Sequence, residues 1–482
     1  MADGNLEQLP VPSDSQDKVV SPFQPFKAVN RFLLRILLFY WICFTFPFPL
    51  DLIGLPLGIV DPEGQPPWFQ PVSESYKKAF AWVKPVNEEY GKPFTWIYEK
   101  KTEACKWVGK EVLHVEVITQ MTGSGDTMRA YVGCFCAGVI AVGLAILWSV
   151  LAWLVRRWKP AWCPDGLLYR LVCVLVRFFL CGMLFGYGFA KVFPMQFAPP
   201  GAFRLTQQLG DMSPMGLLWT FMGFSTAYQM FTGWVEVAAG LLLVARRTSL
   251  LGALLASLAM GQVFMLNMCF DVPVKLYSLH YLVMSVFLLV PDLGRLTSVL
   301  VLGRAVPAKV FPPMLGRVGV DRTALVLRSL LVVMMLYTQV GSVSQRWMQT
   351  YGGEPAPVSG RWDMVSLKID GKAVTKEDPA FWAWLDFGNK GLVRVGLPNG
   401  QPKMVVYRLG WVPEKNQVAW TRFVPPKPPV TVDYNLSEAD KLEVKGTFDG
   451  KVISATLKPA PEKQYELMNR GFHWIQEFPY NR

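Results

Sequence analysis

Seven long apolar segments constrain the fold of this chain more than any other feature. Each is about 18 to 30 residues long, which is the length a helix needs to cross a hydrocarbon core about 30 Å thick. Backbone polar groups in a bilayer find no water, so such segments must be helical. The segments cover residues 28–49, 130–155, 167–191, 217–245, 248–270, 274–292 and 323–343. They predict an all-α polytopic membrane bundle of about seven spanning helices, with the lipid bilayer as its first partner.

The composition indicates that only part of the chain lies in the membrane. With 52% hydrophobic residues among 482, the chain is too apolar for one soluble domain and too mixed to be membrane-embedded throughout. The net charge of +12 raises the question of a nucleic-acid partner. The basic residues lie beside apolar segments and not in one patch, so we expect no nucleic acid to bind.

The basic residues also predict how the spans are oriented. Arg156 and Arg157 follow the second span, Arg246 and Arg247 follow the fourth, and further arginines lie in the 297–322 connection. Positive residues in short connections mark the cytoplasmic side. We therefore expect a cytoplasmic (inner) membrane protein with a cytoplasmic N-terminus and an extracytoplasmic C-terminal domain. Residues 1–25 are polar, so no signal peptide is expected.

From about residue 345 onward the pattern changes to short alternating runs separated by Pro and Gly. Such alternation predicts an antiparallel all-β domain. The FDGK sequence at 448–451 and the PNGQ sequence at 398–401 are typical of hairpin turns. A small barrel leaves no exposed strand edge, so we expect a lipocalin-like barrel in preference to a sandwich. Trp362 then either closes one end of the barrel or lies in an ordinary β core.

These patterns divide the chain into eight parts. They are a cytoplasmic tail (1–27), the first span (28–49), a partly helical extracytoplasmic loop (50–129), the second span (130–155), a four-helix membrane core (156–296), a cytoplasmic loop (297–322), the last span (323–343) and the β domain (344–482).

A glutamate near the middle of the fourth span is the strongest candidate for function. Glu236 lies about 15 Å along the helix from the paired arginine that ends the span. A carboxylate at that depth is costly unless it is neutral, hydrated or paired. Arg177, in the third span, is predicted at a similar depth, so we expect an intramembrane ion pair or proton-acceptor site. The alternative is that this pair only locks two helices together.

Six further polar residues are predicted to line a cavity that opens outward. Most fall in the outer halves of their spans, and Gln229 shares a helix face with Glu236. A single histidine such as His280 more often makes ordinary hydrogen bonds at the membrane interface than serves as a ligand or proton carrier. The candidate ligand-binding residues are Tyr187, Lys191, Gln229, Gln262, Asn267 and His280.

Signals for a cofactor are sparse. The sequence contains no CxxC motif and no haem-binding CxxCH motif. Its three histidines are far apart, so we expect no metal site. A disulfide from Cys105 to Cys134 or Cys136 is one alternative, and unpaired buried thiols are the other.

The stretch from Tyr187 to Leu296 resembles the DoxX-like family of four-helix membrane proteins. The resemblance rests on GYGFAK at 186–191, which ends one helix, and on Glu236 with Gly240 followed by the basic residues that end the next. The founding members are membrane subunits associated with thiosulfate:quinone oxidation, and relatives associate with thiol-redox proteins. The resemblance implies quinone-linked chemistry, a redox partner protein and a long form with added spans and a β domain.

Three hypotheses of different class follow. The first is a redox-associated membrane subunit of a larger complex, in which Glu236, Arg177 and the outer polar residues bind a quinone or move a proton. The second is a noncatalytic scaffold that anchors the β domain, recruits a partner and forms a homo- or hetero-oligomer. The third is a small-molecule or lipid transporter, which the lack of an inverted repeat disfavours. Whether the chain is an enzyme by itself stays open.

Overall fold

The computed structural model describes most of the spans and much of the β domain. The described residues are 28–48, 64–79, 84–119, 122–158, 165–308, 318–352, 358–387, 392–396, 407–412, 417–422, 430–438, 441–448, 451–461, 465–471, 473 and 476. The predicted tail (1–27) and the predicted turn at 398–401 lie outside them.

Six described helices are long and apolar enough to cross a membrane, which indicates a multi-pass membrane protein. Helix α1 (Ala28–Thr45), which we expected as the first of about seven spans, is not one of the six. The six are α4 (Met128–Trp158), α5 (Asp165–Val192), α8 (Thr226–Val244), α9 (Ser249–Cys269), the segment formed by α10 (Lys275–Leu289), η5 (Val290–Asp292) and α11 (Leu293–Leu300), and α12 (Val318–Tyr351).

The predicted continuous span 217–245 is wrong, because the chain breaks at Ser225. This residue has extended backbone angles and ends α7 (Pro214–Phe224), and its side chain accepts a hydrogen bond from Tyr228 N to cap α8. Ser213 caps α7 in the same way, through Gly216 N, and Pro214 occupies the first helical position. Helix α7 is therefore a short helix before the span α8.

Helices α5 and α8 pack closely because glycine lies at their contact. A Cβ on Gly188 would lie 2.9 Å from the Gly233 carbonyl oxygen, and one on Gly233 would lie 2.6 Å from the Gly188 carbonyl oxygen. Further along, a Cβ on Gly240 would lie 2.7 Å from the ring of Phe185. Small residues allow such close approach in membranes, where packing drives helix association.

Helix α1 packs against α4 and α5 and is anchored by a buried ion pair. Arg35 donates to Asp165 from Nε at 3.0 Å and from Nη2 at 2.8 Å, so the pairing is bidentate. Arg35 also donates to Ser149 Oγ at 2.7 Å. The pair connects the first helix to the start of α5 and to α4.

The segment between α1 and α4 is partly helical and contacts two spans. It contains α2 (Gln70–Ala79), α3 (Lys84–Trp107) and the π-helical turn η3 (Val108–Val112). Tyr76 of α2 stacks on Tyr337 of α12 with ring centroids 3.8 Å apart, and burial raises the pKa of Tyr76 to about 12. Cys105 of α3 is buried, Cys134 and Cys136 of α4 are partly buried, and all three are free thiols in the structure. The disulfide alternative stays a prediction.

The turn before α4 caps the start of α10. The Asp126 carboxylate accepts hydrogen bonds from Lys275 N and Leu276 N, each at 2.9 Å. Asp126 therefore supplies the cap that satisfies the first backbone N–H groups of α10. Asp271 instead has a positive φ of 50° and pairs with the Lys275 ammonium at 2.7 Å.

The C-terminal region is a nine-stranded antiparallel sheet in the order β2-β1-β3-β4-β5-β6-β7-β8-β9, with an additional β1–β9 pairing. Its hairpin β8–β9 pairs Phe448 with Lys451, as the FDGK sequence predicts. The strands are β1 (Gly360–Ile369), β2 (Lys372–Val374), β3 (Trp384–Phe387), β4 (Leu392–Gly396), β5 (Tyr407–Val412), β6 (Gln417–Arg422), β7 (Val430–Glu438), β8 (Lys441–Phe448) and β9 (Lys451–Pro459).

The sheet has its own apolar core, but the structure does not show a lipocalin-like barrel. The described β4–β5 pairing joins only Leu392 to Arg408 and Val393 to Tyr407. Trp362 is buried among the core residues, and its Nε1 donates to the Val358 carbonyl oxygen at 2.9 Å. Trp362 therefore contributes to a β core, which agrees with the second interpretation of this residue.

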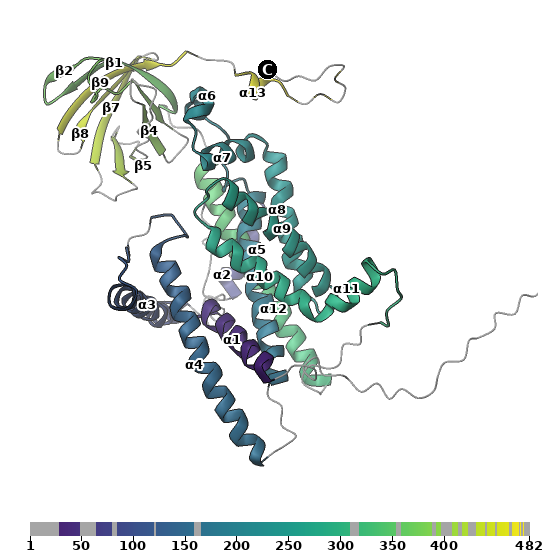
Figure 1. Ribbon diagram of the computed structural model, residues 1–482. Helices are drawn as coiled ribbons and strands as arrows, with labels where there is room; N and C mark the ends of the chain where they lie inside the picture. Colours follow the sequence, from purple (N-terminus) through teal and green to yellow (C-terminus); the bar gives the residue numbers. More distant parts are fainter. Residues whose placement is uncertain are drawn as a thin grey trace, which may run out of the picture.

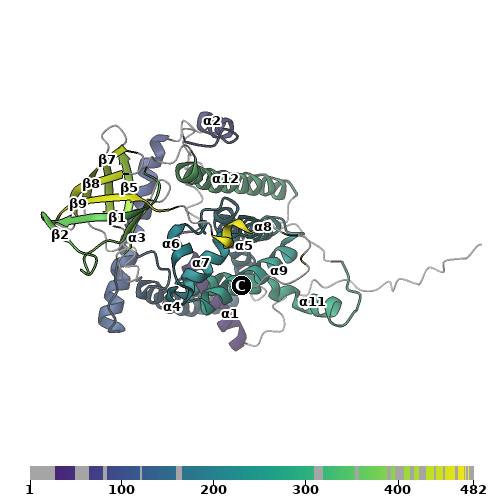
Figure 2. The same cartoon turned by 90° about the horizontal axis from the view of Figure 1, so that it is seen from above.

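The sheet lies beyond the end of the bundle where α6 (Ala202–Thr206) and η4 (Leu209–Asp211) connect α5 to α7 (Figure 1). Arg361 of β1 donates to Thr206 Oγ1 at 3.3 Å. Seen from above, α12 runs along one side of the α5 and α8 pair, and the short C-terminal helix α13 (Glu466–Asn469) lies over the bundle (Figure 2).

We predict that Gly233→Val separates α5 from α8. The added side chain meets backbone atoms of α5 that cannot rotate away, so the free energy of unfolding should fall by about 1–3 kcal/mol. Gly143→Val on α4 is the control, since a Cβ there meets nothing within 4 Å. Thermal unfolding of both variants in detergent checks the prediction, and equal melting temperatures would contradict it.

Candidate functional site

A cavity of about 360 Å³ lies among α5, α7, α8, α9 and α10, toward the end of the bundle that carries α6. Most of its lining is apolar or aromatic. Five predicted site residues line it, namely Tyr187, Lys191, Glu236, Gln262 and Asn267. Its volume falls within the range of about 300–1,000 Å³ that small-molecule sites occupy.

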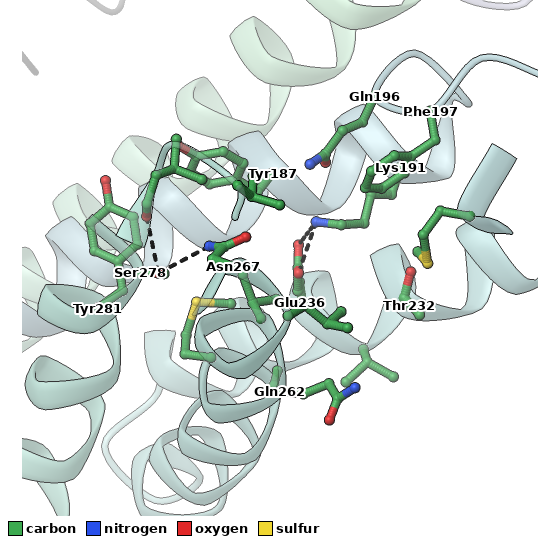
Figure 3. Close-up of a pocket in the computed structure, with 18 of the residues that line it drawn as sticks. Tyr187, Lys191, Gln196, Phe197, Thr232, Glu236, Gln262, Asn267, Ser278 and Tyr281 are labelled. Carbon is green, nitrogen blue, oxygen red and sulfur yellow. Dashed lines mark hydrogen bonds and ion pairs between the residues drawn. The ribbon is translucent and has the colours of Figure 1, made fainter. Parts of the chain in front are cut away.

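A buried ion pair forms one wall of the cavity (Figure 3). Lys191 Nζ donates to Glu236 Oε1 at 2.9 Å and to Oε2 at 2.8 Å. Lys191 is 5% exposed and Glu236 is 2% exposed, so both charges are withdrawn from the surface. The glycine contact between α5 and α8 brings the two helices close enough for this pairing, because Gly233 packs against the Cβ of Lys191. The predicted carboxylate therefore has a partner.

The partner is Lys191, however, and the predicted pairing of Glu236 with Arg177 is wrong. Helices α5 and α8 run antiparallel, and Gly240 of α8 already lies beside Cys181 of α5. In that register Glu236 lies level with the last turns of α5, and Arg177 lies level with the opposite end of α8. Counting residues from each predicted span end misplaced Arg177, because α5 extends well beyond the end of α8.

Further polar groups of the cavity come from α5, α9 and α10. Asn267 is buried and its Nδ2 donates to Ser278 Oγ at 3.0 Å. Tyr187 and Tyr281 lie with ring centroids 6.3 Å apart, and the Lys191 ammonium lies 5.8 Å from the Tyr187 ring centroid. The polar groups are few, and aromatic rings surround them, as in sites for apolar molecules with one polar end.

Gln196 is a cavity residue that the sequence did not indicate. Its Oε1 is buried and has no hydrogen-bond donor in the described part of the chain, although the residue lines the cavity. A buried polar atom without a partner is costly, and in a cavity it points to a ligand or a bound water. The only sequence signal was a polar residue in the apolar PMQF stretch after α5.

Besides Arg177, two predicted site residues lie elsewhere. Gln229 is buried but holds the loop after α5, since its amide accepts from Phe197 N at 2.9 Å and donates to Phe197 O at 3.1 Å. His280 faces α1, where its Nε2 lies 2.7 Å from the Tyr40 hydroxyl and its ring stacks on Phe44 at 4.2 Å. Protein atoms satisfy the hydrogen-bonding groups of both side chains, and neither residue lines the cavity.

Several lining residues are exposed on the bundle surface between α8 and α9. Phe231 of α8 is 63% exposed and Leu258 of α9 is 73% exposed. Gln262, one helical turn beyond Leu258, is also exposed. In a bilayer this surface faces lipid, so the cavity is accessible to a molecule dissolved in the membrane.

The arrangement can bind a polar head and hold a charge, but it provides few groups for metal chemistry. Among the described residues, no group of three or more His, Cys, Asp or Glu residues is placed to hold a metal ion. The Lys191 ammonium is a hydrogen-bond donor, and the Glu236 carboxylate is an acceptor. The wall of the cavity therefore presents a hydrogen-bond donor and a hydrogen-bond acceptor within one bidentate ion pair.

The comparisons with known proteins identify a relative of unknown role. No family model matches the chain, and no solved structure matches it. The uncharacterized protein YwoB of Bacillus subtilis (strain 168) is 35% identical over 118 residues, which are 24% of this chain and 73% of that protein. The chain therefore belongs to the same family as YwoB.

Proposed function

We propose that this protein is a membrane subunit that binds a lipid-soluble ligand of the quinone class and acts with a redox partner protein. The observation that supports the proposal is the bidentate Lys191–Glu236 pair in the wall of an apolar, aromatic-lined cavity. A buried ion pair is weak evidence for stabilisation, because removing both charges from water offsets most of their attraction. Its place beside an open cavity favours a role in binding.

The quinone class suits the chemistry of this cavity. A quinone head is a planar ring with carbonyl oxygens that accept hydrogen bonds, and its reduced form carries hydroxyls that donate them. Lys191 supplies a donor, and Glu236 and the unpaired Gln196 Oε1 supply acceptors. The apolar tail of such a molecule would extend out of the cavity between α8 and α9, where Phe231 and Leu258 are exposed.

The resemblance of residues 187–296 to the DoxX-like family adds to the proposal, since its founding members are associated with quinone-linked oxidation. We place the protein in the cytoplasmic membrane with the arginine-rich end of the bundle inside. The cavity and the β domain would then lie toward the extracytoplasmic side, where the sheet, closing as a small barrel, would meet the redox partner.

A noncatalytic scaffold is the second candidate. The contact that favours it is the same α5–α8 interface, in which Gly188 and Gly233 meet and the Lys191–Glu236 pair fixes the register. In this account the pair is a lock between two helices, and the cavity has no ligand of its own.

Filling the cavity tests the proposal without altering the ion pair. Ala259 lines the cavity from α9, and we expect Ala259→Trp to weaken binding of a short-tailed benzoquinone by at least tenfold because the indole occupies the ligand volume. Met265→Trp is the matched control, since Met265 is on the same helix, is 55% exposed and is not among the lining residues. Titration of each detergent-solubilised variant with the quinone, followed by tryptophan quenching, measures the affinities. Wild-type protein that binds no quinone would refute the proposal.

A double substitution distinguishes the contribution of the ion pair to stability from its contribution to quinone binding. Lys191→Met leaves the Glu236 carboxylate buried without its partner, which should cost about 3–5 kcal/mol of stability. Lys191→Met combined with Glu236→Gln removes both charges, so most of that stability should return while quinone binding stays lost. Thermal unfolding and quinone titration of the single and double variants give both quantities. A stable double variant that binds quinone as well as wild type would contradict a role of the ion pair in binding.

A further inference from the structure

Three arginines, two from helices α5 and α12 and one from the turn after α8, lie at the end of the bundle opposite the cavity. Helices α5 and α12 run parallel in their contact, since a Cβ on Gly182 would meet Met335 and one on Gly186 would meet Gln339, one turn further on in each helix. Extending this register toward the start of both helices places Arg177 of α5 beside Arg328 of α12. The charges of the two residues lie close enough to repel each other.

The third arginine comes from the turn that follows α8. In the antiparallel α5–α8 register, Cys181 donates to the Gly240 carbonyl oxygen, so the turn of α5 that carries Arg177 lies beside the residues that follow α8. Arg246 is among them and contributes its charge to the same region. Apolar residues close in sequence to the three arginines, Phe178, Val244 and Val332, pack in one cluster.

Two of these guanidinium groups have buried donors that the protein does not use. Arg177 Nε and Arg328 Nε are both inaccessible, and neither has an acceptor in the described part of the chain. A guanidinium has five N–H donors and remains charged when buried, so an unused buried donor is costly. Mutual repulsion of three cations adds to that cost unless an anion lies among them.

We propose that Arg177, Arg328 and Arg246 form a binding site for a phosphate group, carried by an anionic phospholipid headgroup or by a free phosphate. Guanidinium groups match phosphate oxygens in bidentate geometry. Basic pockets between membrane helices on the cytoplasmic side are typical sites for anionic lipid headgroups. The position agrees, because the arginines lie where the expected cytoplasmic surface of the bilayer meets α5, α8 and α12.

The site is independent of the ligand cavity. Arg177 lies about 21 Å along α5 from Lys191, given a rise of 1.5 Å per residue. Loss of phosphate binding would therefore leave quinone binding intact, and the two proposals can fail separately.

Thermal unfolding of the full chain in detergent tests the phosphate site. Wild-type protein is titrated with phosphatidylglycerol, with phosphatidylcholine and with inorganic phosphate, and the same series is repeated with Arg177→Gln and Arg328→Gln. We expect phosphatidylglycerol to raise the melting temperature of wild type, phosphatidylcholine to have no such effect, and each substitution to weaken the apparent affinity at least fivefold. Two variants are used so that one remains if the other does not fold.

Arg157→Gln on α4 is the matched control, because Arg157 is exposed and lies over the Trp153 ring instead of in the cluster. Its response to phosphatidylglycerol should equal that of wild type. A response to phosphatidylglycerol alone assigns the site to a lipid headgroup, and a response to inorganic phosphate as well assigns it to phosphate in general. No response of the wild type, or equal loss in the Arg157→Gln control, would overturn the proposal.

Discussion

The close contact between α5 and α8 is the constraint on which the candidate site depends. Glycines at this contact let the backbones approach until Gly233 meets the Gly188 carbonyl and the Lys191 Cβ. At that separation a lysine at the end of α5 reaches the carboxylate of α8 with two hydrogen bonds. The same contact sets the antiparallel register of the two helices. In that register Arg177 lies at the other end of the bundle.

The two ends of this helix pair have opposite character. At the end near α6, a cation and an anion neutralise each other beside an apolar cavity. At the other end lie Arg177 of α5, Arg328 of α12 and Arg246 of the turn after α8. Arg177 and Arg328 each have a buried donor with no acceptor among the described residues. Under the two proposals, the chain would hold an uncharged amphipathic molecule at one membrane depth and an anion at another, with helix α5 running between them.

The sequence predicted the polytopic character, the β region and the need of Glu236 for a partner, because hydropathy, alternation and a charge in an apolar segment are local signals. It did not predict the partner of Glu236, since depth was counted from span ends and α5 and α8 differ in length. Ser225, which splits the predicted fourth span, gave no strong break signal. Gln229 and His280 were recognised as polar, but only the packing shows that a loop and α1 already satisfy them.

The central claim is that the Lys191–Glu236 pair binds the head of a quinone-class ligand. Cryo-electron microscopy of the protein in lipid nanodiscs, loaded with a stoichiometric short-tailed quinone, tests it most directly. We predict density for a planar head in the cavity, within hydrogen-bond distance of Lys191 or Glu236, and a tail that leaves between α8 and α9. An empty cavity in a map that shows quinone bound elsewhere on the protein would contradict the account.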